Sequence, residues 1–454
     1  MALLSIDPST NKVIEQYEAH SVSEIDRRID VAVKASRRMR EMPVADRARI
    51  VAALAEKLEA DVEPLAERMT MEMGKPIKDA RAEVKKCALA CRWAAETGPR
   101  VLADRSVQME GRKKTYVRRE PLGVLLAIMP WNYPLWQLFR FAAPNVVAGN
   151  TVLLKHAANV TGSSLDIERL FSDAGEGVLQ SLLMEHNEHI GQVIDDRRVA
   201  GVTLTGSVRA GRAVGARAGA ALKKVVLELG GSDPFIVLPD ADLDRAADTA
   251  AAARLVNTGQ SCIAAKRFIV HRDVYDGFVD RFVAAIERRV VGDPRLDATD
   301  LGPMAREDLR DELAGQVRRT VDAGARAVIG GQIPRGPGSF YEPTVLVDVP
   351  LDSVAAKDEL FGPVASVFPV TDDEEAIERA NTSEFGLGAS IWSNDIDRAE
   401  SVARRLDAGM AFVNDMVKSD PRIPFGGVKD SGYGRELGEE GILEFVNAKA
   451  VVIQ

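Results

Sequence analysis

The sequence predicts an α/β protein built on a doubly wound, mainly parallel sheet. From residue 123 the chain alternates strand-sized apolar runs with helical stretches, and a second alternation runs from residue 234 to about residue 410. A long helical segment at 21–100 precedes both. Strands that alternate with helices are joined by right-handed crossovers, which makes the strands parallel and covers them with helices. The two alternations therefore indicate two α/β units.

The first helical segment shows apolar residues at helical spacing. From 44 to 73 these residues recur three or four positions apart, and Gly74 and Pro76 end the pattern. Cys87 and Cys91 follow, four positions apart on one helical face. That spacing could bind a metal, but the sequence offers no third ligand nearby. We interpret both cysteines as buried packing residues and predict no metal site.

The first alternation supplies five candidate strands. Helical stretches at 133–147 and 207–221 separate some of them. The strand-like runs lie at 123–129, 151–155, 178–184, 201–205 and 224–229. Ligands of such sheets bind beyond the carboxyl ends of the strands, so we expect binding residues directly after these runs.

The second alternation begins with apolar runs at 234–238 and 267–270. Glycines and prolines at 330–338 mark a loop inside this unit rather than a boundary between domains. The chain closes with a glycine-rich stretch at 425–438 and a short apolar strand at 450–454.

Composition excludes several classes of function. The 454 residues suffice for two or three domains, and the net charge of −9 with no basic stripe argues against a nucleic-acid partner. No apolar run reaches the roughly 18 residues of a membrane helix, and the first residues lack the pattern of a signal peptide. Three cysteines are too few for a disulfide framework. We therefore predict a cytoplasmic protein without a membrane partner.

Three short stretches carry residue types suited to catalysis. Cys262 lies in the small, polar stretch GQSCIAAKRF, which favours a nucleophile over a packing residue. Glu228 closes an apolar strand, where partial desolvation would make it a base near neutral pH; a solvated turn residue is an equal alternative. Asn132 stands in the stiff turn PWNYP, where its amide could donate to an oxyanion, although alone it indicates only a rigid turn.

A fourth stretch, TGSVRAG at 205–211, joins a strand to a helix. Glycines at a helix start allow backbone N–H groups to approach a phosphate, and the helix dipole favours the anion. The spacing matches neither the dinucleotide fingerprint nor a P-loop, so a plain strand-to-helix turn is an equally good interpretation.

The four stretches together suit the oxidation of an aldehyde to an acid. A thiolate adds to the carbonyl and forms a thiohemiacetal, whose oxyanion needs hydrogen-bond donors. The hydride then needs an adjacent nicotinamide, and the resulting thioester needs an activated water. The cysteine, amide, phosphate-binding turn and carboxylate would each have one task.

The whole chain resembles the aldehyde dehydrogenase superfamily. Seven motifs occur in the family's order and near its spacing: PWNYP, LLKHA, TGSVRAG, LELGGSDPF, GQSCIAAKR, ELFGPV and PFGGVKDSGYGRE. The resemblance implies a Rossmann-type cofactor domain at 1–107 and 123–227 and an α/β catalytic domain at 228–410. It also implies a small β oligomerisation arm at 108–122 and 440–454, a return segment at 411–439 that lines the active site, and a homodimer or homotetramer.

The resemblance implies roles for three catalytic residues. Cys262 would be the nucleophile, and Glu228 the base that activates the deacylating water. Asn132 would form the oxyanion hole with the backbone N–H of Cys262.

For the cofactor, the resemblance implies that Lys155 binds the adenosine ribose and that Gly206 and Ser207 contact the pyrophosphate. Trp131 would flank the pyrophosphate. Glu359 would hold the nicotinamide ribose, with Phe361 packed against the ring.

Within the superfamily, three segments of the sequence are similar to those of bacterial succinate-semialdehyde dehydrogenases. The similar segments are PLWQLFRFAAP, LELGGSDPFIV and MVKSDPRIPFGG. Such an enzyme must bind a carboxylate at the far end of its substrate. The resemblance gives this task to Arg140 and Ser419. Because Arg140 lies in a largely apolar helix, an ion pair with a structural acid is the alternative.

Ala158 bears on the choice of cofactor. Relatives that prefer NAD often have a glutamate three residues after the cofactor lysine, where it repels a 2′-phosphate. Here that position is Ala158, so the cofactor is NADP or NAD, with NADP favoured.

Three alternatives stay open at this stage. The enzyme could oxidise another small semialdehyde or an aliphatic aldehyde. The same cysteine, amide and carboxylate could instead hydrolyse thioesters or esters without a nicotinamide. A lens-type or scaffold protein that retains an old fold is the non-enzymatic alternative.

Overall fold

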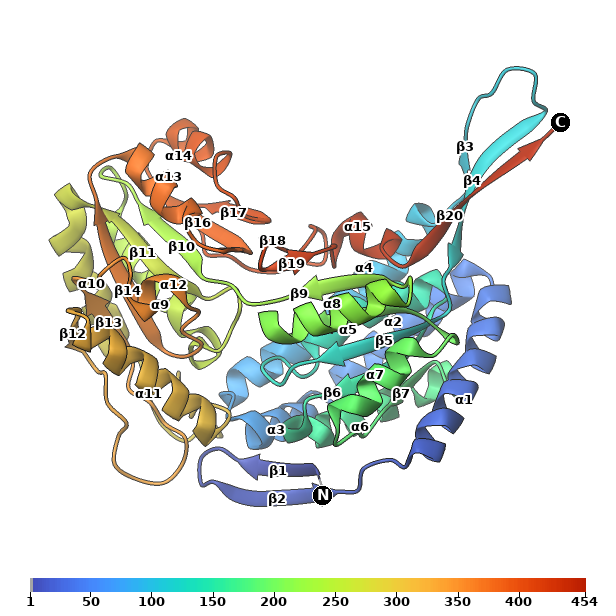
Figure 1. Cartoon of the computed structure of the whole chain (residues 1–454), viewed down its shortest axis with the longest axis horizontal. Coiled ribbons are helices and arrows are strands. Elements are labelled where there is room, and N and C mark those ends of the chain that lie inside the picture. The colour runs from blue at the N-terminus through green and yellow to red at the C-terminus, as the bar shows by residue number, and fades with distance from the viewer. Residues whose placement is uncertain (1–2) are drawn as a thin grey trace.

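The computed structural model describes residues 3–454 and arranges the strands of that part of the chain in five sheets (Figure 1). The first two positions of the predicted cofactor domain lie outside the described residues. A small hairpin of β1 (Leu3–Asp7) and β2 (Lys12–Tyr17) comes first. Two larger α/β units follow, and they confirm the predicted fold class.

The first unit contains a six-stranded sheet in the order β19-β9-β8-β5-β6-β7. Five of its strands are parallel to one another, and β19 (Gly432–Tyr433) is antiparallel to β9. The parallel strands are β5 (Val124–Met129), β6 (Thr151–His156), β7 (Leu179–Ser181), β8 (Val199–Thr205) and β9 (Lys224–Glu228). Strands buried on both faces read as continuous apolar runs, which is why the sequence located them.

Helices cover both faces of this sheet. Those between the strands are α5 (Trp136–Ala148), α6 (Thr161–Leu170), α7 (Asn187–Asp195) and α8 (Val208–Ala220). Those before it are α1 (Val22–Glu41), α2 (Val44–Ala60), α3 (Val62–Met73) and α4 (Ile77–Val101). Cys87 and Cys91 are fully buried in α4. This agrees with their interpretation as packing residues.

Two boundaries differ from the sequence pattern. The run at 178–184 forms a strand only at 179–181, because Leu183 exchanges hydrogen bonds with His20 instead of extending the ladder. The helical pattern at 44–73 is divided into α2 and α3 at Asp61, whose backbone leaves the helical region at φ −102° and ψ 23°. The apolar spacing continues across this break, so the pattern alone does not reveal it.

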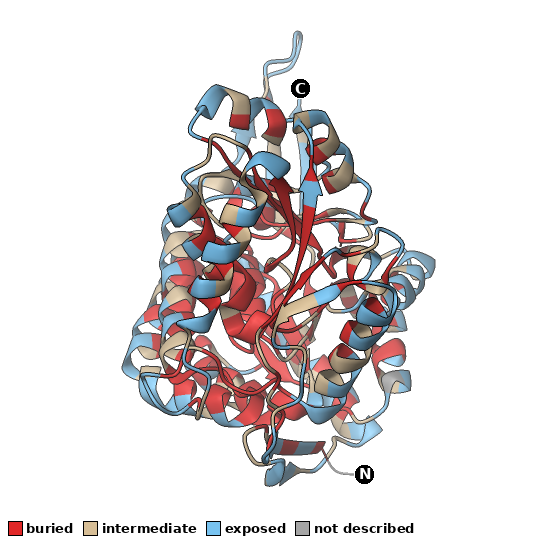
Figure 2. Cartoon of the chain, turned by 90° about the vertical axis from the view of Figure 1, so that its left-hand side faces the viewer, coloured by how far each residue is buried: buried red, intermediate tan, exposed pale blue. Residues whose placement is uncertain are grey.

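The second unit contains a seven-stranded sheet in the order β12-β13-β14-β11-β10-β16-β17, parallel except at β12. Its strands are β10 (Asp233–Val237), β11 (Ala265–His271), β12 (Arg326–Ile329), β13 (Thr344–Val347), β14 (Val364–Val370), β16 (Gly388–Trp392) and β17 (Met410–Val413). The helices are α9 (Leu243–Leu255), α10 (Tyr275–Glu287), α11 (Glu307–Asp322), α12 (Val354–Lys357), α13 (Asp373–Asn381) and α14 (Ile396–Ala403). Figure 2 shows the buried residues concentrated in the strands and inner helix faces.

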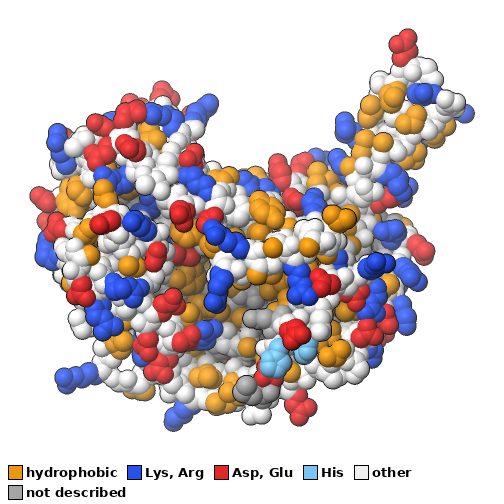
Figure 3. Space-filling view, in the orientation of Figure 1, with side chains coloured by type: hydrophobic (Ala, Val, Ile, Leu, Met, Phe, Trp, Pro, Cys, Tyr) orange, Lys and Arg blue, Asp and Glu red, His pale blue; other side chains and the backbone are white. Residues whose placement is uncertain are grey.

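An antiparallel sheet projects from the body and contains residues of both predicted arm segments, together with residues 105–106 from the predicted cofactor domain (Figure 1). It consists of β3 (Arg105–Ser106), β4 (Lys114–Pro121) and β20 (Val446–Ile453), preceded by helix α15 (Gly438–Leu443). The arm carries exposed hydrophobic side chains, including Met109, Val452 and Ile453, among its charged ones (Figure 3).

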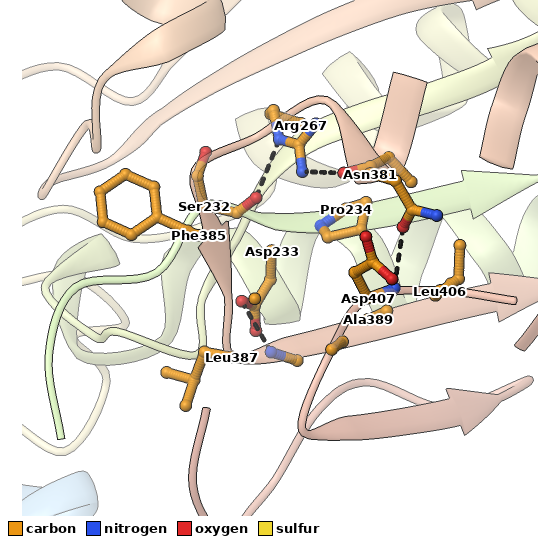
Figure 4. Close-up of a pocket in the computed structure, with 14 residues that line it drawn as sticks. Ser232, Asp233, Pro234, Arg267, Asn381, Phe385, Leu387, Ala389, Leu406 and Asp407 are labelled. Carbon is orange, nitrogen blue, oxygen red and sulfur yellow. Dashed lines mark hydrogen bonds between the residues drawn. The ribbon is translucent and has the colours of Figure 1, made fainter. Parts of the chain in front are cut away.

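Buried polar groups fix the segment that crosses from one sheet to the other (Figure 4). The Arg267 guanidinium donates to the carbonyls of Ser232, Arg379 and Ala380 at 2.8–2.9 Å. Asp233 accepts a hydrogen bond from the Gly388 N–H at 3.0 Å, and burial raises the pKa of its carboxyl to about 7. The cavity between these groups has a volume of about 10 Å³, enough for one water at most. These contacts hold Ser232 and Asp233 at the start of β10.

Candidate active site

Cys262 follows a strained turn between α9 and β11. Asn257 and Thr258 both adopt left-handed backbone angles, with φ of 54° and 56°. Such angles are costly for residues other than glycine and persist only where the surroundings hold them. Asn257 is held because its side-chain amide donates to the Asn132 carbonyl at 2.8 Å and to the Gln260 carbonyl at 3.1 Å. The turn therefore couples the Cys262 loop to the PWNYP turn.

The Cys262 side chain is half-buried and lines two cavities. The large cavity, about 310 Å³, lies between the two α/β units. The inner cavity, about 110 Å³, lies between α4, α5 and residues 416–419. A nucleophile in this position can face one ligand in each cavity.

The surroundings of Cys262 act on its proton in opposite directions. Burial raises the pKa of the Cys262 thiol to about 12, while the positive charges of Arg140 and Lys266 lower it. Lys266 is itself buried, and its ammonium donates to the carbonyls of Ser261 and Cys262 at 2.9 Å each. The thiol is therefore protonated at neutral pH and needs a proton acceptor before it can attack.

Asn132 is buried and lines the large cavity beside Cys262. Its side-chain amide donates to the Gln260 carbonyl at 3.1 Å. An amide nitrogen carries two N–H groups, so one of them is left to donate to an oxyanion formed at Cys262. The structure thus places the predicted amide and the predicted nucleophile at one site.

Glu228 lies at the carboxyl end of β9, as the sequence predicts. In the described part of the chain, neither of its carboxylate oxygens has a hydrogen-bond partner. Burial raises the pKa of Glu228 well above its usual range, and the Arg140 charge acts against this shift. Gly426 makes room for the carboxylate, since a Cβ there would lie 2.8 Å from Oε1. Glu228 lies outside the linings of both cavities, so a base at this position must act through water or after a side-chain rotation.

The large cavity fits a dinucleotide by the chemistry of its lining. Gly206 and Ser207 lie at the N-terminus of α8, where a Cβ on Gly206 would meet nothing closer than 3.7 Å. An open helix N-terminus of this kind binds phosphate groups. Trp131 and Phe361 contact each other edge to face across the cavity wall, with ring centroids 5.7 Å apart.

Glu359 completes this lining with a fixed carboxylate. It accepts a hydrogen bond from the Gly231 N–H at 3.1 Å and pairs with Lys266 at 3.2 Å. The predicted residues Lys155 and Ala158 are not among the described residues that line the large cavity. Lys155 is half-buried at the end of β6, and Ala158 is exposed just after it.

Arg140 lines the inner cavity and is almost fully buried. It forms an ion pair with the buried Glu436, and its guanidinium lies 4.5 Å from the centroid of the Phe425 ring. Arg140 therefore has the acidic partner that the sequence left open as an alternative. It also lies on the wall of the inner cavity. Ser419 lines the same cavity, with its hydroxyl 2.6 Å from the ammonium of Lys86.

The Arg140–Glu436 pair predicts a loss of stability when it is broken. We expect Glu436→Gln to lower the free energy of unfolding by about 3–5 kcal/mol, because it leaves the Arg140 charge buried without a counter-charge. The urea midpoint of the variant measures this loss. The matched control is Glu400→Gln, which breaks an exposed pair with Arg404 and should cost less than about 1 kcal/mol. Equal midpoints for the two variants would contradict the argument.

Sequence reasoning missed three residues of the site: Lys86, Lys266 and Glu436. Lys266 stands inside the quoted motif GQSCIAAKRF, and its place four residues after Cys262 was the available signal. Glu436 is likewise the last residue of the quoted motif PFGGVKDSGYGRE, whereas Lys86 lies on a segment with the pattern of an ordinary helix. Across residues 3–454 there is no group of three His, Cys, Asp or Glu side chains that could hold a metal. The same residues contain no helix with the length and apolar character to cross a bilayer.

Comparison with known proteins decides the family. Residues 2–451 match the model of the aldehyde dehydrogenase family. The chain belongs to the aldehyde dehydrogenase family. It is 48% identical over 455 residues to a probable succinate-semialdehyde dehydrogenase [NADP(+)] of Synechocystis sp., covering the whole of both chains.

Two further aldehyde dehydrogenases resemble this one. Succinate semialdehyde dehydrogenase [NAD(P)+] Sad of Escherichia coli (strain K12) is 48% identical and covers 99% of this chain and 97% of its own. The crystal structure of succinic semialdehyde dehydrogenase from Streptococcus pyogenes, in complex with NADP+, superimposes with a TM-score of 0.97. That chain is 36% identical and is covered completely, as is this one. The family that the sequence motifs predicted is therefore confirmed.

Proposed function

We propose that this aldehyde dehydrogenase oxidises succinic semialdehyde to succinate, with NADP+ as its preferred cofactor and NAD+ as a second one. The observation that carries the proposal is the position of Cys262, which faces the large cavity on one side and the inner cavity on the other. Full-length relatives at 47–48% identity bear the name succinate-semialdehyde dehydrogenase, mostly with NADP(+).

The reaction begins at the Cys262 thiol. Once its proton has passed to a base, the thiolate adds to the aldehyde carbon held in the inner cavity and forms a tetrahedral thiohemiacetal. The free N–H of the Asn132 amide and the backbone N–H of Cys262 donate to the resulting oxyanion. The positive charges of Arg140 and Lys266, which lower the thiol pKa, also stabilise the negative charge that develops there.

The residues of the large cavity would hold the dinucleotide. The N-terminus of α8 at Gly206 and Ser207 would bind the pyrophosphate, with Trp131 beside it. Glu359 would accept hydrogen bonds from the nicotinamide ribose, and Phe361 would pack on the ring. When bound, the nicotinamide supplies the acceptor for the hydride of the adduct on Cys262.

Deacylation is the proposed task of Glu228. Its buried carboxylate has a raised pKa and no hydrogen-bond partner among the described residues, which suits a general base. It removes a proton from a water that attacks the thioester carbon. The Cys262 sulfur then leaves, and the product is a carboxylic acid.

The preference for NADP+ rests on Ala158. This exposed residue stands three positions after Lys155, and its small neutral side chain neither repels nor excludes a 2′-phosphate. The half-buried Lys155 ammonium lies on the same sheet edge and attracts anionic groups.

Formation of reduced cofactor at 340 nm tests the proposed function. We expect kcat/KM for succinic semialdehyde to exceed that for butanal by at least about tenfold, and NADP+ to give a higher kcat/KM than NAD+. The two aldehydes differ in the distal carboxylate. Equal rates for both would contradict the substrate. No reduced cofactor with either aldehyde, together with cleavage of a thioester or ester in the absence of nicotinamide, would indicate a hydrolase instead.

Assembly and location complete the proposal. The projecting sheet of β3, β4 and β20 carries exposed apolar side chains and a free strand edge, which favours pairing with a second copy in a homodimer or homotetramer. All three cysteines are free thiols, which fits a reducing cytoplasm.

A further inference from the structure

Lys86 is a cation on the wall of the inner cavity. It belongs to none of the family motifs and has no role in the proposed reaction steps. It projects from α4, and its side chain is half-buried. The ammonium lies 2.6 Å from the Ser419 hydroxyl and 4.3 Å from the centroid of the Trp136 ring. Ser419 and Trp136 line the same cavity as Cys262. The side chain is thus held at the cavity by one neutral hydrogen bond and one aromatic face.

The charge of Lys86 lacks a counter-charge. Two carboxylates, Glu83 and Asp420, act on the charge of Lys86, but both form their hydrogen bonds and ion pairs with other residues. Glu83 pairs with the buried Lys75 and accepts the backbone N–H groups of Leu135 and Trp136, while Asp420 binds the Arg422 guanidinium at 2.7–2.8 Å. Within residues 3–454, no carboxylate oxygen forms an ion pair with Lys86. A partly desolvated cation without an anion is costly unless a ligand supplies one.

The other two cations that line this cavity, Arg140 and Lys418, differ in that respect. The Arg140 guanidinium is already neutralised by Glu436 and hydrogen-bonded to Thr205 at 3.3 Å, and the Lys418 ammonium pairs with Asp415 at 2.5 Å. An anion that enters the inner cavity therefore finds two charges that are compensated and one that is not. The uncompensated charge attracts it more strongly.

We propose that Lys86, together with the Ser419 hydroxyl, binds the distal carboxylate of the substrate and sets the preference for an aldehyde acid over a neutral aldehyde. The inference rests on the proposed oxidation of succinic semialdehyde and adds the residue that selects it. The Ser419 hydroxyl donates to one carboxylate oxygen while Lys86 pairs with the other. Cys262 lines the same cavity, so the aldehyde carbon and the carboxylate of one molecule would be held in the same space.

Lys86 also makes this selectivity depend on pH. Burial lowers the pKa of the Lys86 ammonium to about 8; the Arg140 charge acts in the same direction, and Cys87, Glu83 and Asp420 act against it. The charged and titratable groups around Lys86 are these four and, in the lining of the same cavity, Tyr133, Cys262 and Lys418. Lys86 is charged below about pH 8, so binding of the carboxylate is strongest there and is lost as the pH rises through that value.

The test compares Lys86→Met with Lys85→Met. Both variants replace a lysine on α4 by a neutral side chain of similar length, but Lys85 is exposed and lies outside the inner cavity lining. The measured quantity is kcat/KM for succinic semialdehyde divided by kcat/KM for butanal, with saturating NADP+. Titration of Cys262 affects both aldehydes and cancels in this ratio.

We expect Lys86→Met to lower the ratio at least about thirtyfold, mainly through KM for succinic semialdehyde. Lys86→Arg should restore most of it, because arginine supplies the same charge. In wild type the ratio should fall between about pH 7 and about pH 9.5, and in Lys86→Arg it should stay level, since arginine does not titrate in this range. Lys85→Met should match wild type in both ratio and pH profile.

Three results would overturn the inference. An unchanged ratio in Lys86→Met would show that another group binds the carboxylate, while the wild-type preference would leave the proposed function standing. Equal losses with both aldehydes would show that Lys86 is structural. A wild-type enzyme that oxidises butanal as well as succinic semialdehyde would remove the proposed substrate itself, and the inference with it.

Discussion

Replacing Cys262 by alanine is expected to lower kcat with every aldehyde by at least about 10⁴-fold, the scale seen when an enzyme loses its nucleophile. Without the sulfur, neither thiohemiacetal nor thioester can form. Because the N-terminus of α8, Glu359 and Phe361 are untouched, the variant should still bind NADP+. Reduced cofactor measures the first outcome, and titration calorimetry with NADP+ measures the second.

Cys91→Ala is the matched control for this variant. Cys91 is fully buried in α4, lies outside both cavities and has a pKa that burial raises above its usual range. Its replacement removes one sulfur from the core and should reduce stability slightly without reaching the chemistry. Residual turnover of Cys262→Ala near the level of Cys91→Ala would refute the assignment of the nucleophile.

The second large effect concerns Glu228→Gln. We expect steady-state turnover to fall about 10²–10⁴-fold, the usual contribution of a general base. The first turnover should persist, because acylation and hydride loss do not require a deacylating water. Stopped-flow absorbance should therefore show a burst of reduced cofactor, near one equivalent per Cys262, followed by a very slow phase.

An added nucleophile distinguishes a lost base from a damaged fold. Hydroxylamine attacks thioesters without a carboxylate to activate it, so it should accelerate the slow phase of Glu228→Gln far more than that of wild type. The absence of a burst would mean that Glu228 acts before the thioester forms, for example on the Cys262 proton. The absence of rescue by hydroxylamine would point to a structural role.

Much of the fold could be predicted from the sequence because its strands are buried on both faces. The runs that became β5, β6 and β8 are rich in apolar residues, and Gly123 and Pro130 bound the first of them. The break between α2 and α3 was not predictable, because the apolar spacing passes through Asp61 without interruption. The shortened β7 was not predictable either, since the cause is a contact with His20, far away in the sequence.

The site likewise contains residues that the sequence predicts and residues that it does not. Cys262, Asn132 and Glu228 belong to short motifs with unusual residue types, and the structure brings the first two to one cavity wall. Lys86 could not be recognised, because on a helix it resembles any amphipathic lysine. Only folding places it beside Ser419, 333 residues later in the chain. The pairing of Arg140 with Glu436 is equally a product of tertiary structure, although the apolar context of Arg140 pointed to some acidic partner.

Peptide mapping of the covalent intermediate tests the central claim most directly. Wild-type enzyme is mixed with succinic semialdehyde and NADP+, quenched with acid after milliseconds, digested with trypsin and analysed by mass spectrometry. Cleavage after Arg254 and Lys266 isolates Cys262 in the peptide 255–266, while Cys87 and Cys91 share the peptide 87–92. We predict a succinyl group on 255–266 alone. A succinyl group on 87–92, or on neither peptide while succinate accumulates, would contradict catalysis through Cys262.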